Sequence, residues 1–178
     1  MNFAAFCLLL TLVAGQAGAQ PADVAAIQAR EARNADARTL AALERFRGAL
    51  VKRFGGDPAL TMLEISETEG EALVVRAGGS PEHVIWQGER WIGTEGRQLK
   101  PWASPAIAAT HAFPLSSVNA EPIRAWLDAW RRVPGQATDF VTGYAIGYDP
   151  ARSRIAVRAT VGSMTTGRLS QQTFDAAK

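Results

Sequence analysis

Residues 83–94 read His-Val-Ile-Trp-Gln-Gly-Glu-Arg-Trp-Ile-Gly-Thr, and this stretch gives the sharpest structural signal in the chain. Two short runs rich in β-branched and aromatic residues flank Gly88-Glu89, as in a hairpin with a two-residue loop. A Gly-X pair suits a type II′ turn, and this loop places Trp86 directly opposite Trp91. The stretch therefore predicts an antiparallel hairpin with both tryptophans on one face.

This hairpin lies within a longer run of strand signals. Residues 60–68 and 71–77 have strand character and flank Glu69-Gly70, so we expect another hairpin there. A further turn at Glu95-Gly96 leads into a short strand over residues 97–100. Together these segments predict an antiparallel meander, followed by an irregular connector over residues 101–114.

A second group of strands is expected near the C-terminus. Residues 140–148 alternate large with small side chains, and the chain then turns at Asp149-Pro150. The returning strand has apolar residues at alternate positions, namely Ile155, Val157, Ala159 and Val161. The tail from residue 163 carries no clear pattern.

Two helices are predicted, one before each group of strands. Residues 23–54 are rich in Ala and Arg, and residues 20–38 read as a frayed extension of the better-patterned second half. The second helix is capped by Asn119, carries Trp126 and Trp130 on its apolar side, and ends before Pro134-Gly135. The apolar stripe of the first helix comprises Leu40, Leu43, Phe46, Leu50 and Phe54.

The order of these elements predicts the fold. Strands grouped in hairpins, with helices set apart from them, indicate an α+β domain whose antiparallel sheet is packed on one face by two helices. The order also indicates a degenerate helix-hairpin repeat. A single domain over residues 20–178 fits the length of the chain.

The first 19 residues have the features of a secretory signal peptide. An apolar run over residues 3–14 precedes Ala17-Gly18-Ala19, which predicts cleavage before Gln20. The run is shorter than the ~20 apolar residues that span a bilayer, so we expect no stable membrane span after cleavage. Cleavage removes Cys7, the single cysteine, and the expected location is periplasmic or secreted, without a disulfide.

The composition excludes several classes of protein. With 47% hydrophobic and 20% charged residues, the chain is neither disordered nor fibrous. A formal net charge of +2 is too small for a dedicated nucleic-acid binder, so no nucleic-acid partner is expected. The charge is uneven, because residues 113–178 carry eight basic and five acidic side chains.

The sequence presents no motif for catalysis, metal binding or a cofactor. His83 and His111 lie near Ser80 and Ser116, but without the strand-turn-helix setting of a nucleophile elbow. Two separated histidines without a nearby cysteine do not form a zinc signature. We therefore predict no catalytic residue, no metal and no cofactor. Four acidic residues are interpreted as a solvated hairpin end, namely Glu64, Glu67, Glu69 and Glu71.

The candidate binding residues are two tryptophans and three arginines. Trp86 and Trp91 form either core packing, which the apolar residues around them favour, or an aromatic recognition surface. Arg154 and Arg158 lie on the outward side of the last predicted strand, and Arg152 extends this row at the turn. Arginine side chains in such a row can contact carboxylates or phosphates.

These features favour an exported, non-catalytic domain that binds an envelope protein or an anionic ligand. The binding surface would be the sheet face or the arginine-bearing hairpin. Two alternatives stay open: a small exported hydrolase that uses carboxylates or a loop histidine, and a carrier of apolar ligands. A cleft beside Trp86 or Trp91 favours the hydrolase, whereas a filled face favours binding.

Overall fold

The computed structural model describes residues 21–76, 81–95 and 111–175. They form an antiparallel sheet and two α-helices, which confirms the predicted α+β class. In chain order the elements are α2 (Pro21–Phe54), β1 (Ala59–Ser66), β2 (Glu69–Val75), β3 (Glu82–Gln87), β4 (Arg90–Ile92), β5 (Phe113–Pro114), the 3₁₀-helix η2 (Leu115–Ser117), α4 (Ala120–Arg131), β6 (Asp139–Asp149), β7 (Arg154–Ser163) and β8 (Leu169–Asp175). The predicted signal peptide and the predicted strand over residues 97–100 lie outside the described residues.

The sheet joins two helix-meander units through their first strands. Its strand order is β4-β3-β2-β1-β6-β7-β8, and β5 pairs with β1 beside the start of that strand. Strands β1 and β6 pair antiparallel at the centre, so one meander extends outward on each side. The order of a helix followed by a meander therefore occurs twice, as the sequence indicated.

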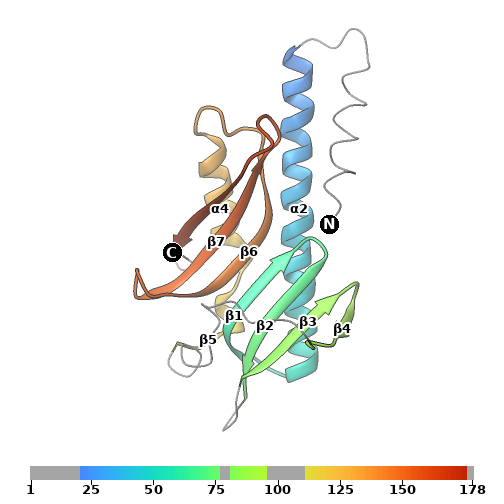
Figure 1. Cartoon of the computed structure of the whole chain (residues 1–178), viewed down its shortest axis with the longest axis vertical. Helices are drawn as coiled ribbons and strands as arrows, with labels where there is room; N and C mark the ends of the chain where they lie inside the picture. The colour runs from blue at the N-terminus through green and yellow to red at the C-terminus, as the bar shows by residue number, and fades with distance from the viewer. Residues whose placement is uncertain (1–20, 77–80, 96–110, 176–178) are drawn as a thin grey trace.

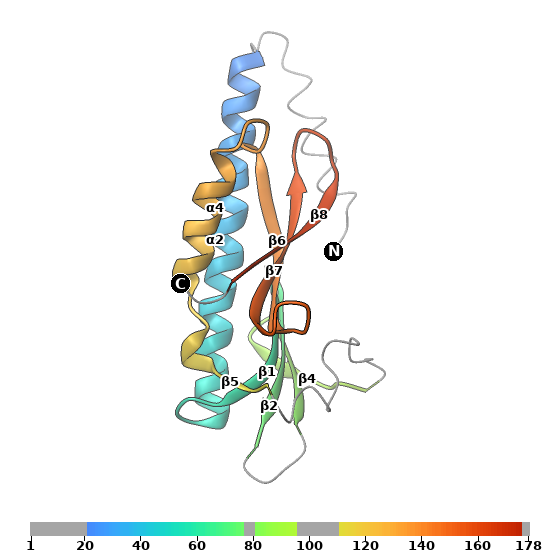
Figure 2. The same ribbon diagram turned by 90° about the vertical axis from the view of Figure 1, so that its left-hand side faces the viewer.

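Both helices cover the same face of the sheet (Figure 2). Helix α2 runs along both meanders, and α4 lies beside it over the C-terminal strands (Figure 1). Phe46 and Leu50 of α2 and Ile123 of α4 are completely or almost completely buried against this face. The hydrophobic core therefore lies between the helix layer and the sheet.

Helix α2 is longer and more firmly packed than its sequence pattern predicted. It is helical from Pro21, and Ala32, Ala35 and Asp36 are buried within the expected frayed extension. These residues contact the sheet because β6 runs beneath this part of the helix, and Val141 of β6 donates a backbone hydrogen bond to Asp36. The first turns, before Ala32, and the last turn, residues 51–54, consist of exposed or half-buried residues.

Helix α4 begins as its sequence predicted. The side chain of Asn119 accepts a hydrogen bond from the backbone N–H of Glu121 at 3.0 Å, so it caps the helix. Ile123 and Leu127 are buried, and Trp126 stacks on Phe174 of β8 with ring centroids 4.5 Å apart. The apolar stripe of α4 therefore holds the C-terminal meander.

The two predicted N-terminal hairpins need different corrections. Trp86 pairs with Trp91 as predicted, but Gly88 and Glu89 both have positive φ, so the turn is type I′ and not type II′. In the hairpin of β1 and β2 the chain turns at Glu67-Thr68, two residues earlier than expected. Gly70 lies within β2 and not in the turn. Its lack of a side chain leaves room for the ring of Phe46.

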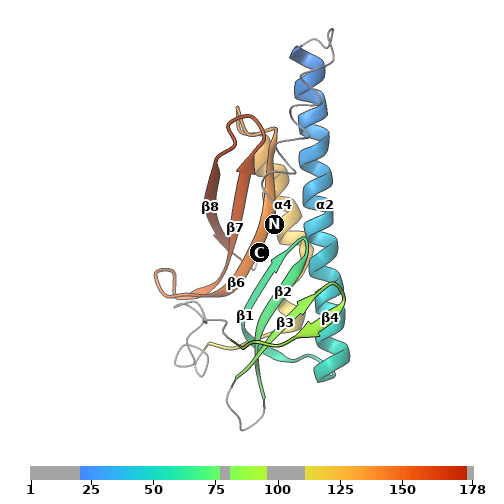
Figure 3. The ribbon, with the colours of Figure 1, turned by 45° about the vertical axis from the view of Figure 1, so that its right-hand side comes forward.

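The C-terminal meander has three strands. Strands β6 and β7 form the predicted hairpin, with a register shift between Val141 and Gly143 that marks a β-bulge. The tail that carried no clear pattern forms β8, which pairs with β7 along its full length. Strand β8 is an outer strand of the sheet (Figure 3).

The face opposite the helices differs between the two units. Met62, Leu73 and Ile85 point to this face by strand alternation and are fully buried there, so this part of the N-terminal meander is not an open surface. In the C-terminal meander, exposed side chains such as Arg154 point to the same face. Neither α2 nor α4, the two α-helices in the described part of the chain, has the length and apolar composition of a membrane span.

Candidate functional site

The predicted row of arginines lies on the outer face of the C-terminal meander. Ile155, Val157 and Val161 of β7 point toward the helices, so Arg154 and Arg158 point away from them. The side chain of Arg154 is 55% exposed and that of Arg158 is 29% exposed. The alternation of β7 therefore places two cations on the open face, with the exposed Arg152 at the adjoining turn.

Acidic side chains accompany these arginines. Arg154 Nε lies 2.9 Å from Asp175 Oδ1 on β8, and both Arg152 and Arg158 lie 4.0 Å from carboxylate oxygens of Asp149. Three arginines therefore lie within 4.0 Å of the carboxylates of two aspartates. The 2.9 Å contact with Asp175 orients the guanidinium group of Arg154.

The two predicted tryptophans pack against α2. Trp86 is 8% exposed and stacks on Phe46, with ring centroids 5.9 Å apart. The centroid of the Trp91 ring lies 6.2 Å from that of Phe46 and 6.5 Å from that of Phe54. The guanidinium carbon of Arg53 lies 4.6 Å from the centroid of the Trp91 ring. The pair therefore joins the sheet to the helix, and the face on which it lies is filled.

Glu82 and His83 are neighbours in the sequence, but their side chains have different partners in the structure. Adjacent strand residues point to opposite faces, so Glu82 pairs with Arg53 and Arg76 while His83 pairs with Glu71. His83 Nε2 lies 2.8 Å from Glu71 Oε1, and both side chains are mostly buried. Ser80 lies outside the described residues.

The segment around His111 also separates in space. The His111 ring stacks on Tyr148, with centroids 3.5 Å apart. Ser116 instead binds Asp57 through its hydroxyl and its backbone N–H, at 2.6 and 2.7 Å. These two hydrogen bonds hold the pKa of the Asp57 carboxyl below its ordinary value. Ser116 therefore fastens a loop and is not positioned by the histidine.

The acidic residues of the first hairpin are also distributed among partners. Glu67 pairs with Arg38 at 2.8 Å, and Glu71 pairs with His83. Across residues 21–76, 81–95 and 111–175, no three His, Cys, Asp or Glu side chains come close enough together to hold a metal ion. Glu67 and Glu71 of this hairpin therefore contact side chains of the protein itself.

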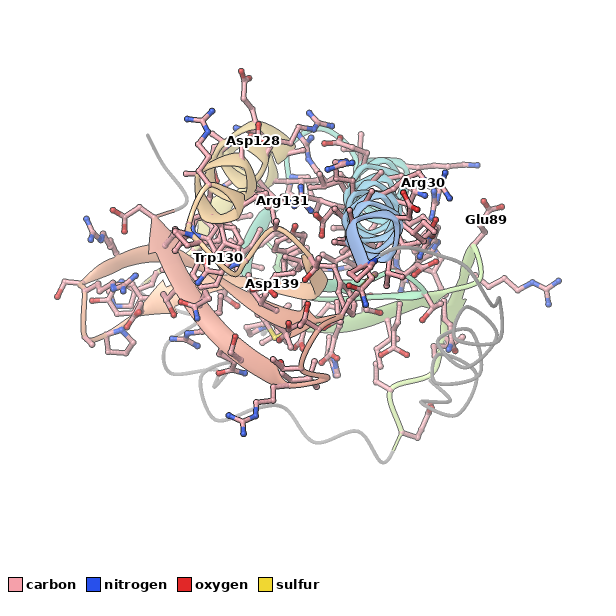
Figure 4. The ribbon with its side chains drawn as sticks, turned by 90° about the horizontal axis from the view of Figure 1, so that it is seen from above. Arg30, Glu89, Asp128, Trp130, Arg131 and Asp139 are labelled. Atoms are coloured by element: carbon pink, nitrogen blue, oxygen red, sulfur yellow. The ribbon has the colours of Figure 1, made fainter. Side chains whose placement is uncertain are left out.

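A buried polar cluster joins α2, α4 and β6, and the sequence analysis did not identify it. Asp36 is 3% exposed, accepts a 2.7 Å hydrogen bond from Val141 N, and forms an ion pair with Arg131. Trp130 Nε1 donates to Asp139 at 3.2 Å beside this pair (Figure 4). In the sequence, Asp36 stands between Ala35 and Ala37 of α2. A charged residue between two small ones was the one indication of this cluster.

Burial shifts the pKa values of two groups in this cluster, as expected for a cluster with a structural role. Burial lowers the pKa of Arg131, and the nearby cation Arg33 lowers it further. Burial also raises the pKa of Tyr144, whose hydroxyl faces this cluster without a hydrogen bond from the described residues. Because the groups are enclosed by three elements, the cluster positions those elements and offers no open surface.

A scan of protein-family models, a search of curated proteins and a search of solved structures each found no match. The candidate site therefore rests on the geometry of the outer face of the C-terminal meander, which we define as Asp149, Arg152, Arg154, Arg158 and Asp175.

Proposed function

We propose that the protein is an exported, non-catalytic domain that binds an acidic partner protein in the cell envelope. The binding surface is the outer face of the C-terminal meander. The observation that carries this proposal is the outward position of Arg154 and Arg158 on a strand whose other side is anchored in the core. The apolar run and the Ala-x-Ala site within residues 1–19 support export.

The filled tryptophan face supports binding over a ligand cleft. Trp86 and Trp91 pack on Phe46, so their side of the sheet is occupied by the protein itself. The outer face of the C-terminal meander is instead held rigidly by strand pairing, with Arg154 already oriented by Asp175. A partner carboxylate gains affinity from such oriented guanidinium groups because less side-chain entropy is lost on binding.

The positive charge of the C-terminal third supports a partner with a negatively charged surface. The excess of basic side chains in this third attracts an acidic surface over a distance of about one Debye length, ~8–10 Å at physiological salt. This attraction mainly raises the association rate, and the contacts with arginine then set specificity. Binding should therefore weaken as the salt concentration rises.

The test is a double charge reversal, Arg154→Glu with Arg158→Glu. A matched control reverses two exposed arginines on the helix layer, Arg45→Glu with Arg124→Glu, and thus changes the net charge equally. We expect the first variant to lose partners that the wild type and the control retain from envelope extract at low salt. We expect both variants to stay folded, because none of the four arginines belongs to the hydrophobic core, and thermal unfolding checks this. An identical set of partners for all three proteins would contradict the proposed surface.

A further inference from the structure

Among the described residues, no strand pairs with the outer edge of β8. This strand is seven residues long and pairs with β7 on one side, and no described element lies along its other side (Figure 3). The opposite edge strand, β4, is three residues long, and short edge strands offer few pairing groups. The free edge of β8 is therefore the longer pairing surface among the described strands.

The backbone groups at this edge can be assigned from the hydrogen bonds. Ser163 N donates to the carbonyl of Arg168 at 3.0 Å, so this carbonyl points toward β7. In an antiparallel ladder, these directions alternate from one residue to the next. The N–H and C=O groups that point outward therefore belong to Leu169, Gln171, Thr173 and Asp175.

The composition of β8 does not prevent edge pairing. Proteins commonly protect edge strands with proline, lysine or a bulge. Strand β8 reads Leu-Ser-Gln-Gln-Thr-Phe-Asp and pairs with β7 without a register shift. Its central residues are neutral, and Leu169 is 55% exposed. None of these protective devices is present within the strand.

We propose that this edge binds a second copy of the chain through antiparallel pairing of the two β8 strands. The charge pattern favours this occupant and direction, because the strand is preceded by Arg168 and ends at Asp175. Antiparallel pairing places Arg168 of each copy alongside Asp175 of the other copy, whose carboxylate is then shared with Arg154 of its own chain. Parallel pairing would instead bring like charges together.

The outward groups also define the register. Two copies use all four outward residues when Leu169 faces Asp175 of the second copy and Gln171 faces Thr173. These side chains all belong to the face away from the helices, so the pairing joins equivalent faces of the two sheets. The two-fold axis then runs perpendicular to the sheet. Arg154 and Arg158 of both copies consequently lie on one continuous face.

Opposite charges placed in this register test the proposal. One variant carries Gln171→Lys with Thr173→Lys, and the other carries Gln171→Glu with Thr173→Glu. Each variant alone opposes like charges across the two-fold axis, whereas their mixture opposes lysine with glutamate. By sedimentation velocity over a range of concentrations, we expect a wild-type dimer, at least a tenfold weaker dimer for each variant, and recovery in the equimolar mixture.

Amide hydrogen exchange supplies a readout that does not depend on the charged variants. In dilute wild-type protein, exchange should alternate, with fast amides at the four outward residues and slow amides at Ser170, Gln172 and Phe174. The outward amides should become protected as the concentration rises. Gln171→Pro should remove this change and leave the slow amides protected, because its lost N–H points away from β7.

A monomeric wild type at all concentrations would overturn the proposal and leave the edge to a strand of a different protein. A dimer that both charged variants form as well as the wild type would also overturn it, because its contact would then lie elsewhere.

Discussion

Asp36 and Arg131 show how a single ion pair holds two helices on a sheet. Both charges are removed from water, and the cost of that removal is offset by their attraction and by the hydrogen bond from Val141. The same pair adds little over a well-packed apolar contact, but losing one partner leaves the other charge buried. The arrangement therefore specifies how α2 and α4 sit on β6.

A double-mutant cycle on this pair tests that account. Asp36→Asn keeps an acceptor for Val141, and Arg131→Met keeps most of the aliphatic side chain. Each change alone should lower the free energy of unfolding by about 3–5 kcal/mol, because it leaves one buried charge unpaired. The double variant should lose clearly less than the sum of the two, measured by urea denaturation. Additive losses would mean that the two charges do not interact.

At the scale of elements, the contact between α2 and the N-terminal meander depends on one ring and one glycine. A Cβ atom at Gly70 would lie 2.5 Å from Phe46 Cγ, so the ring sits directly on the backbone of β2. The ring also contacts Trp86 and Trp91. Phe46 therefore joins α2 to β2, β3 and β4 at one point.

Two glycine-to-alanine changes separate this packing from helix propensity. Gly70→Ala should lower the free energy of unfolding by about 1–3 kcal/mol, because the new methyl group overpacks the Phe46 site. Gly48→Ala places its methyl group in open space on α2, and should raise stability by about 0.5–1 kcal/mol. Urea denaturation of both variants checks the opposite signs. Equal effects would show that the ring moves aside without cost.

At the scale of the whole molecule, a loop contact ties the end of α2 to the segment before α4. Asp57 follows α2, and Ser116 lies in η2 after the long connector between the two units. The two hydrogen bonds from Ser116 stabilise the charged carboxylate and lower its pKa in the folded state. This contact therefore adds stability that depends on pH.

The sign of this dependence follows from the lowered pKa. The stabilisation is complete above the ordinary carboxyl pKa of 3.8 and is lost as the pH falls through the lower folded-state value. Ser116→Ala removes the hydroxyl hydrogen bond, so the variant should be less stable than the wild type at neutral pH. The difference should shrink below about pH 4, as followed by thermal unfolding across pH. A difference that stays constant down to acidic pH would exclude Asp57 as its cause.

Features that depend on neighbours along the chain can be predicted from the sequence. The pairing of Trp86 with Trp91 follows from a two-residue loop, and the start of α4 follows from the cap at Asn119. The outward direction of Arg154 and Arg158 likewise follows from the period of two in β7. Local rules are sufficient in these cases because loop length, capping and alternation act over only a few residues.

Features that depend on contacts between distant segments appear only in the folded protein. The first half of α2 has a weak apolar pattern, and it is held because β6 passes beneath it and pairs with Asp36. Strand β8 has a polar sequence, and it becomes a strand because β7 offers backbone partners and Trp126 stacks on Phe174. Asp175 reaches Arg154 for the same reason. Hydrogen bonds and contacts between remote residues leave no periodic pattern in either segment. The sequence pattern of these two segments therefore does not indicate their partners.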